Sequence, residues 1–232
     1  MKGNGRHEYN LSERVTQHLI KHIKQNDLKP GDLVPSEVQV SGDLGISRGV
    51  VRQAYHSLRK AGILEIAMGR SPRVGELRPD AIMPLFVHAL STAQASLEDM
   101  LELRRAVEVR AAELAALHRN ASHVLALRKA IDGMRETVGD LDRLARVDVR
   151  FHDVIGNATG NPLFEIVGRA LRGFYESSMR TGPRSRSSVA QIEKMVETHE
   201  NIADAIEAQQ VSRAGAMMTL HFEESHPWDG RA

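Results

Sequence analysis

The chain has 232 residues, and 41% of them are hydrophobic, which is enough for packed cores and excludes disorder of the whole chain. The absence of cysteine excludes a disulfide scaffold, a thiolate metal site and a cysteine nucleophile. Lys and Arg number 31 against 30 Asp and Glu, so the net charge indicates no class of partner. No stretch reaches the roughly 18 apolar residues of a membrane-spanning helix, and the first ten residues lack the apolar core of a secretory signal. We therefore expect a cytoplasmic protein without a membrane partner.

The charge is unevenly distributed along the chain. Residues 1–75 carry 12 Lys and Arg against 7 Asp and Glu, a net charge of +5, whereas the remaining residues carry 19 against 23, a net charge of −4. Turn-forming sequences are dense in the first part, and the second reads as successive long amphipathic helices. These differences predict two domains, at residues 1–75 and 81–228, joined by a short linker at 76–80.

Three helices are predicted in the first domain. The first has an apolar face over residues 11–23. The second begins at Ser36, because Gln39 follows at the spacing of a capping box. The third has Ser47 at its N-cap and Gly62 just beyond its end. Helix, short turn and helix is the arrangement that results.

A basic stripe follows the third predicted helix at the helical period. Its members are Arg48, Arg52, His56 and Arg59. A helix fits the major groove of DNA, and arginines near its start can reach phosphates or pair with guanine. A solvated basic face is the alternative. However, a β-hairpin is predicted nearby, with Arg70 and Arg73 expected at its tip, and it would be a second basic element able to contact DNA. We therefore favour contact with DNA, with Arg48 and Arg52 as the candidates.

The first domain resembles the winged helix-turn-helix of the GntR superfamily of bacterial transcription regulators. The resemblance covers residues 11–75 and rests on PGD, PSE, LGISR, VRQA, LRKAG and a short wing. It implies DNA binding through positions of the recognition helix and of the wing, which are matched here by Ser47, Arg48, Arg52, Gly69 and Arg70. Val38 replaces the usual arginine after PSE, and SPR replaces the usual glycine-containing wing tip, so we expect a different operator.

Beyond residue 80 the apolar spacing predicts an all-α bundle. The helices are expected near residues 81–92, 97–118, 121–138, 141–157, 161–180, 187–209 and 211–226. Asp148, His152, His199 and His221 interrupt the apolar seams of three of them. A lone core histidine is usually a hydrogen-bonded structural residue, but four such groups in one bundle are costly unless a divalent cation satisfies them. Provided that the three helices converge, these residues predict a site for zinc or nickel, with manganese as a further candidate.

Arg104 is a fifth polar residue in an apolar seam. An always-charged guanidinium in a core needs an anion. That anion is either an acid of its own helix, such as Glu102 or Glu108, or the carboxylate of a bound effector, and the sequence leaves both open.

The second domain resembles the helical ligand-binding domain, of the FCD type, found in the FadR subfamily. LELRRAVE at 101–108, the D-x3-H pair that ends at His152, GNPLF at 160–164 and the two later histidines carry the likeness. The resemblance implies that the Asp and three His hold a divalent cation that also takes water or a small carboxylate effector, and that Arg104 faces this effector. Members of the fatty-acyl branch lack the metal set, so the resemblance disfavours that ligand class.

The two resemblances together predict a homodimeric transcription regulator that is not an enzyme. Its affinity for operator DNA, with half-sites roughly 34 Å apart, would depend on a small carboxylate bound at the metal. Two alternatives stay open: a metal-dependent hydrolase, for which no separate general base is evident, and a DNA-binding protein whose metal is purely structural and which has no effector.

Overall fold

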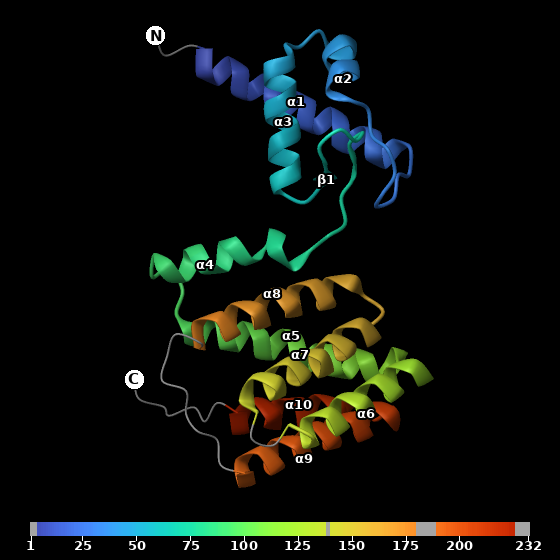
Figure 1. Cartoon of the computed structure of the whole chain (residues 1–232), viewed down its shortest axis with the longest axis vertical. Helices are drawn as coiled ribbons and strands as arrows, with labels where there is room; N and C mark the ends of the chain where they lie inside the picture. The colour runs from blue at the N-terminus through green and yellow to red at the C-terminus, as the bar shows by residue number, and fades with distance from the viewer. Residues whose placement is uncertain (1–3, 138–139, 180–188, 226–232) are drawn as a thin grey trace. The chain divides into compact units, whose positions relative to one another are not determined.

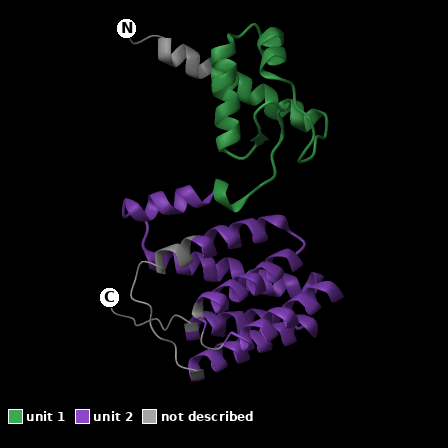
Figure 2. Ribbon diagram, in the orientation of Figure 1, with its two compact units in different colours: residues 1–81 green, residues 82–232 purple. Residues whose placement is uncertain are grey.

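The computed structural model describes residues 4–137, 140–179 and 189–225. The chain divides into two compact units, Met1–Ala81 and Ile82–Ala232 (Figure 2). The division falls next to the linker predicted at 76–80, whereas the predicted domain limit at 228 lies outside the described residues. The mainly α fold, with a helix-turn-helix ahead of a helical bundle, is confirmed.

The first unit has three helices, a two-stranded antiparallel sheet and a short 3-10 helix. They are α1 (Asn4–Gln25), α2 (Glu37–Leu44), α3 (Arg48–Lys60), β1 (Leu64–Glu65), β2 (Arg73–Val74) and η1 (Pro79–Ala81). Both α1 and α2 pack on α3 around a core of apolar side chains. The hydroxyl of Tyr55 in this core donates a hydrogen bond to the carbonyl oxygen of Pro35 and so ties α3 to the turn before α2.

The helix limits follow the predicted signals closely. Ser36 and Gln39 form the reciprocal capping box, and Gly45 ends α2 in the left-handed conformation with φ +64°. Ser47 occupies the N-cap position of α3, but its side chain makes no capping hydrogen bond. Gly62 adopts φ +73° beyond the end of α3, a conformation that glycine adopts without steric cost.

The predicted hairpin is present, with Leu64 opposite Val74 and Glu65 opposite Arg73. The expectation that Arg73 lies at its tip is wrong, because Arg73 belongs to β2 and its guanidinium donates to the carbonyl oxygen of Gly31. Arg70 is exposed in the segment between the strands.

Within its described residues, the second unit has helices as its only regular secondary structure. They are α4 (Met83–Ser91), α5 (Leu97–His118), α6 (Ala121–Arg135), α7 (Leu141–Ala158), α8 (Pro162–Met179), α9 (Val189–Glu207) and α10 (Val211–Ser225) (Figure 1). The helix predicted to reach residue 138 ends earlier, at Arg135, and the helix ends predicted at 180, 187 and 226 fall outside the described residues. None of the helices in the described segments is long and apolar enough to cross a membrane.

Helix α5 is the centre of this bundle, since α7, α8, α9 and α10 all pack against it. Its buried face carries small side chains, Ala111, Ala112, Ala115 and Ala116, which allow neighbouring helices to approach closely. The same helix buries Glu108 one turn earlier and Arg104 two turns earlier. The bundle therefore has an apolar part and a charged part along one helix.

Candidate functional site

The four residues predicted to bind a metal come together in the bundle. Asp148 and His152 lie on α7, His199 on α9 and His221 on α10. Each of the three imidazoles offers a ring nitrogen, and these nitrogens lie within 4.8 Å of one another. The ring centroids of His199 and His221 are 4.6 Å apart, and those of His152 and His221 are 5.1 Å apart. The convergence that the sequence could only assume is thus present.

Asp148 completes the cluster and marks its accessible side. Its Oδ1 lies 2.9 Å from Nε2 of His199 and 3.7 Å from Nε2 of His152. The Asp148 side chain is 26% exposed, whereas the three imidazoles are buried. Burial alone would raise the pKa of Asp148, but the neighbouring imidazoles outweigh it and lower that pKa well below its usual value. An ionised oxygen donor therefore stands beside the nitrogens.

The Nδ1 atoms of two rings face oxygen acceptors, which leaves Nε2 of each ring toward the cluster. Nδ1 of His199 donates to the carbonyl oxygen of Met195 at 2.7 Å. Nδ1 of His152 faces Oε2 of Glu108, yet neither ring nitrogen of His152 completes a hydrogen bond of acceptable geometry among the described residues. Metal-binding histidines are typically held in this way by a carboxylate or a backbone carbonyl.

His221 has the protonation state that a metal ligand needs. Burial, together with the nearby His199 and His152, lowers its pKa well below the usual value, so its ring stays neutral. Three imidazoles with one carboxylate, and a buried Nε2 of His152 that lacks a hydrogen bond among the described residues, fit a divalent cation that accepts nitrogen and oxygen ligands.

Glu108 links the cluster to two buried arginines. Its Oε1 accepts from Nε of Arg104 at 2.8 Å and lies 3.2 Å from Nη1 of Arg172, while its Oε2 faces His152. Burial alone would raise the pKa of Glu108, but His152 and the two guanidiniums lower it well below the usual value. Glu108 is therefore an ionised carboxylate that lies between Arg104, Arg172 and His152.

The sequence left open whether Arg104 pairs with an acid of its own helix or with an effector, and the structure shows a pair within the helix. Arg104 pairs with Glu108, one turn away on α5, and its guanidinium carbon lies 5.2 Å from the ring centroid of Phe222. Its side chain is 8% exposed. Glu108 contacts both Arg104 and His152, so Arg104 lies next to the histidine cluster. Contact of Arg104 with an effector stays a prediction.

The sequence analysis missed Arg172 and its partner Asp153. Arg172, on α8, is buried and bridges Glu108 and Asp153. Gly168 lies one turn earlier, and a Cβ there would meet Nη1 of Arg172 at 3.0 Å, so this glycine makes room for the guanidinium. The available signal was a glycine four residues before an arginine on the same helix.

The predicted DNA-contacting side chains lie on the outer face of α3. All four members of the basic stripe are exposed, while Val51, Ala54 and Leu58 on the opposite face are buried. Nε of Arg52 lies 3.3 Å from Oε2 of Glu37 on α2, a solvated pair that a phosphate could replace. Gly69 has φ +70°, so the turn that presents the exposed Arg70 favours glycine.

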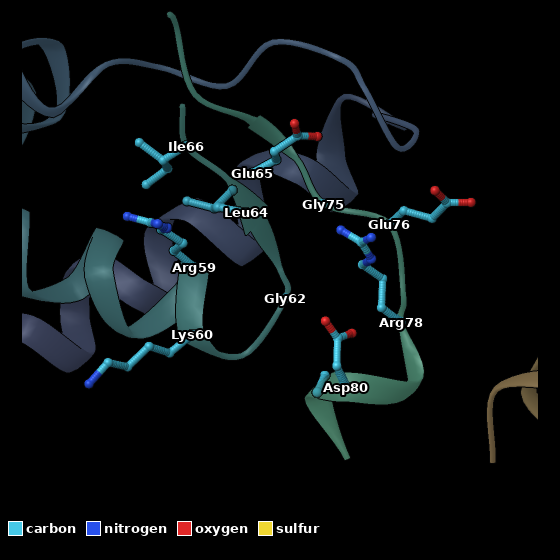
Figure 3. Close-up of a pocket in the computed structure, with 11 residues that line it drawn as sticks. Arg59, Lys60, Gly62, Leu64, Glu65, Ile66, Gly75, Glu76, Arg78 and Asp80 are labelled. Atoms are coloured by element: carbon cyan, nitrogen blue, oxygen red, sulfur yellow. The ribbon is translucent and has the colours of Figure 1, made fainter. Parts of the chain in front are cut away.

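A cavity of about 380 Å³ lies in the first unit, between the end of α3 and residues 75–81 (Figure 3). Acidic and basic side chains are interspersed around it, so no single charge converges on its interior. A Cβ on Gly75 would lie 2.2 Å from the carbonyl oxygen of Gly62, which shows how closely these two segments approach. The cavity contains none of the predicted site residues.

Comparison with known families identifies both units. Residues 11–74 match the model of bacterial regulatory proteins of the gntR family, and residues 99–224 match the FCD domain. Similar curated proteins include the HTH-type transcriptional regulator LutR of Bacillus subtilis, 26% identical over 86% of this chain and 92% of LutR. The HTH-type transcriptional repressor NanR of Salmonella newport is 25% identical over 91% of this chain and 82% of NanR.

A solved structure supports the fold independently. The GntR protein of Streptococcus agalactiae covers 92% of this chain and 98% of its own, with a TM-score of 0.69 at 22% identity. The family models cover the helix-turn-helix and the bundle that holds the histidine cluster. The chain therefore belongs to the GntR family of bacterial regulatory proteins, carries an FCD domain, and is a DNA-binding transcription regulator and not an enzyme.

Proposed function

We propose that this regulator changes its affinity for operator DNA when a small carboxylate metabolite binds beside a divalent metal in the bundle of residues 82–225. The observation that carries the proposal is the cluster of three buried imidazole nitrogens within 4.8 Å, contributed by three different helices. Such a cluster is costly as a purely structural feature, because buried polar atoms need partners and both ring nitrogens of His152 lack a hydrogen bond among the described residues.

Asp148, His152, His199 and His221 would hold the cation, with zinc or nickel favoured by three imidazoles and manganese also compatible. When bound, the cation would supply a Lewis-acid position for a carboxylate oxygen. Glu108 and the Met195 carbonyl orient two of the rings, and the partial exposure of Asp148 gives solvent and solutes a way to reach this side.

Arg104 is the proposed partner of the effector carboxylate. Because Arg104 already pairs with Glu108, an effector would share the guanidinium with that residue. Binding would then alter the charge balance around Glu108, which also contacts His152 and Arg172. The effect on DNA affinity corresponds to a coupling free energy that is typically about 1–3 kcal/mol.

At the DNA, Ser47, Arg48 and Arg52 would contact the major groove, and Gly69 with Arg70 would form the wing contact. The exposure of these positions and the unused Ser47 hydroxyl support this assignment. The active form would be a homodimer whose two-fold axis relates two operator half-sites, and binding to a bacterial operator places the protein in the cytoplasm.

One alternative keeps specific support. The Arg104 and Glu108 pair is complete without any ligand, which favours a regulator whose metal is structural and which responds to no effector. The hydrolase alternative has no such observation, and the relatives are named as regulators.

The test combines metal, effector and DNA on one protein. Elemental analysis and native mass spectrometry of the purified protein should show about one divalent cation per chain and a dimer. Sugar acids, hydroxy acids and dicarboxylates are then titrated onto the protein bound to an operator selected from random duplexes. We expect one class to change the operator affinity about 5- to 150-fold.

Arg104→Gln should keep metal and DNA binding and lose this response, and Arg105→Gln, an exposed neighbour on the same helix, should keep all three. An intact response in Arg104→Gln would remove Arg104 from the effector site. No response to any acid by metal-loaded protein would favour the structural-metal alternative.

A further inference from the structure

A second candidate ligand site lies away from the histidine cluster, in a groove of about 610 Å³ between α6 and α7. Its volume falls in the usual range of small-molecule sites. Five cationic side chains line it against a single acidic one, Asp153. The cations are Lys129, Arg143, Arg146, Arg150 and Arg169.

Three of these cations have no partner among the described residues. Arg143 lies 3.5 Å from Glu136, and Arg169 pairs with Asp153 and Glu165. Lys129, Arg146 and Arg150 make no ion pair or side-chain hydrogen bond with any residue that the structure describes. Arg143, Arg146 and Arg150 share one face of α7, where like charges three and four residues apart destabilise a helix. An external anion would turn this repulsion into attraction.

The floor of the groove is apolar and lined by small side chains. Ala126, Ala130 and Gly133 recur on one face of α6, opposite Val147 and Val154 of α7. A Cβ on Gly133 would lie 3.2 Å from Cγ1 of Val147, so the two helices approach closely at this glycine. The groove therefore combines an uncharged floor with a cationic rim.

We propose that this groove binds a small phosphorylated metabolite, with its phosphate held by Arg146, Arg150 and Lys129 and its uncharged body on the floor. Guanidinium groups pair with phosphate oxygens through two parallel hydrogen bonds, and phosphate offers enough negative charge for several cations at once. A second copy of the chain fits poorly, because a two-fold contact centred on the groove would bring its cations against the same cations of the partner.

The test is calorimetric titration of the full-length protein with inorganic phosphate, AMP and adenosine at low ionic strength. AMP and phosphate should bind, and adenosine should bind far more weakly. In the double variant Arg146→Glu and Arg150→Glu, both exposed positions, the affinity for AMP should fall at least about tenfold.

The matched control is Arg105→Glu with Arg213→Glu, which changes the net charge equally at exposed positions outside the groove. It should bind AMP as the unaltered protein does. Thermal unfolding of both double variants checks that the bundle is folded.

Four outcomes would overturn the proposal. The first is that neither phosphate nor AMP binds at about 10 mM. The second is that AMP binding persists in the groove variant but disappears in His199→Ala, which would assign it to the histidine cluster. The third is that the groove variant loses operator affinity while the protein binds no phosphate, which would make the groove a DNA contact. The fourth is dissociation of a dimer in the groove variant, which would make it a subunit interface.

Discussion

The two units of this regulator place their charged side chains in opposite ways. Within the described residues, every buried polar or charged side chain belongs to the second unit, among them Arg104, Glu108, His152 and Arg172. In the first unit the core is apolar apart from the Tyr55 hydroxyl, and the basic stripe of α3 is exposed. The first unit has its candidate DNA-binding residues on the surface, and the second has the proposed metal and effector residues inside its core.

Because of this difference, a substitution in the first unit can change binding without changing stability, whereas a substitution in the core of the second unit should change both. An exposed arginine can be removed at little cost in folding free energy, since water solvates whatever partner remains. A buried member of an ion network leaves an uncompensated charge when its partner is removed, so stability and ligand binding change together. The following changes test this contrast.

Glu108→Ala should have the largest effect. It leaves Arg104 and Arg172 without their shared carboxylate in the bundle core, so we expect a loss of about 3–5 kcal/mol in the free energy of unfolding, measured by denaturant titration. Glu223→Ala breaks an exposed pair with Arg105 in the same unit and should cost less than about 1 kcal/mol. Equal losses in the two variants would refute the contrast between buried and exposed charges.

Removal of the proposed metal should destabilise the second unit and leave the first unit unchanged. At a free cation concentration of 100 times the dissociation constant, bound metal stabilises the protein by about 2.7 kcal/mol, and a chelator should remove this. Hydrogen exchange should then accelerate in α7, α9 and α10, which carry the proposed ligands, and stay unchanged in α1 to α3. Faster exchange in both units, or in neither, would contradict the assignment.

Arg52→Ala should weaken operator binding by about 1–3 kcal/mol if the side chain contacts a base, with unchanged thermal stability. Lys60→Ala removes the same charge from the far end of α3 and serves as the control, with a smaller effect expected. Binding can be measured by fluorescence anisotropy of a labelled operator. If Arg52→Ala binds normally, Arg52 is not a base contact.

Tyr55→Phe should have the smallest of these effects, a change in the free energy of unfolding that measures the contribution of the buried hydroxyl in the first unit. The hydroxyl that bonds to the Pro35 carbonyl is lost, so we expect a decrease of about 1 kcal/mol in unfolding free energy. Ser57→Ala, at an exposed position of the same helix, should be nearly neutral. A loss as large as that of Glu108→Ala would show that the two cores do not differ in this respect.

Local sequence signals predicted much of this fold because their physics is local. The capping box at Ser36, the αL glycine at 62 and the seam positions of His199 and His221 depend on residues a few places away. Arg73 was misplaced because its partner, the Gly31 carbonyl, lies 42 residues away, and no nearby residue signals it. Gly168 was the one local signal for Arg172, and Arg172 was overlooked because its partners come from two other helices.

The sequence by itself determined which face of each helix is apolar and which polar residues interrupt the apolar faces, because helical periodicity fixes both. It also determined the family, through motifs spread over both units. Only the tertiary structure decided that three imidazoles meet and that Glu108 stands between Arg104, Arg172 and His152. Those contacts depend on how far each helix is shifted and rotated against its neighbours, and that is set by the packing of side chains from distant parts of the chain.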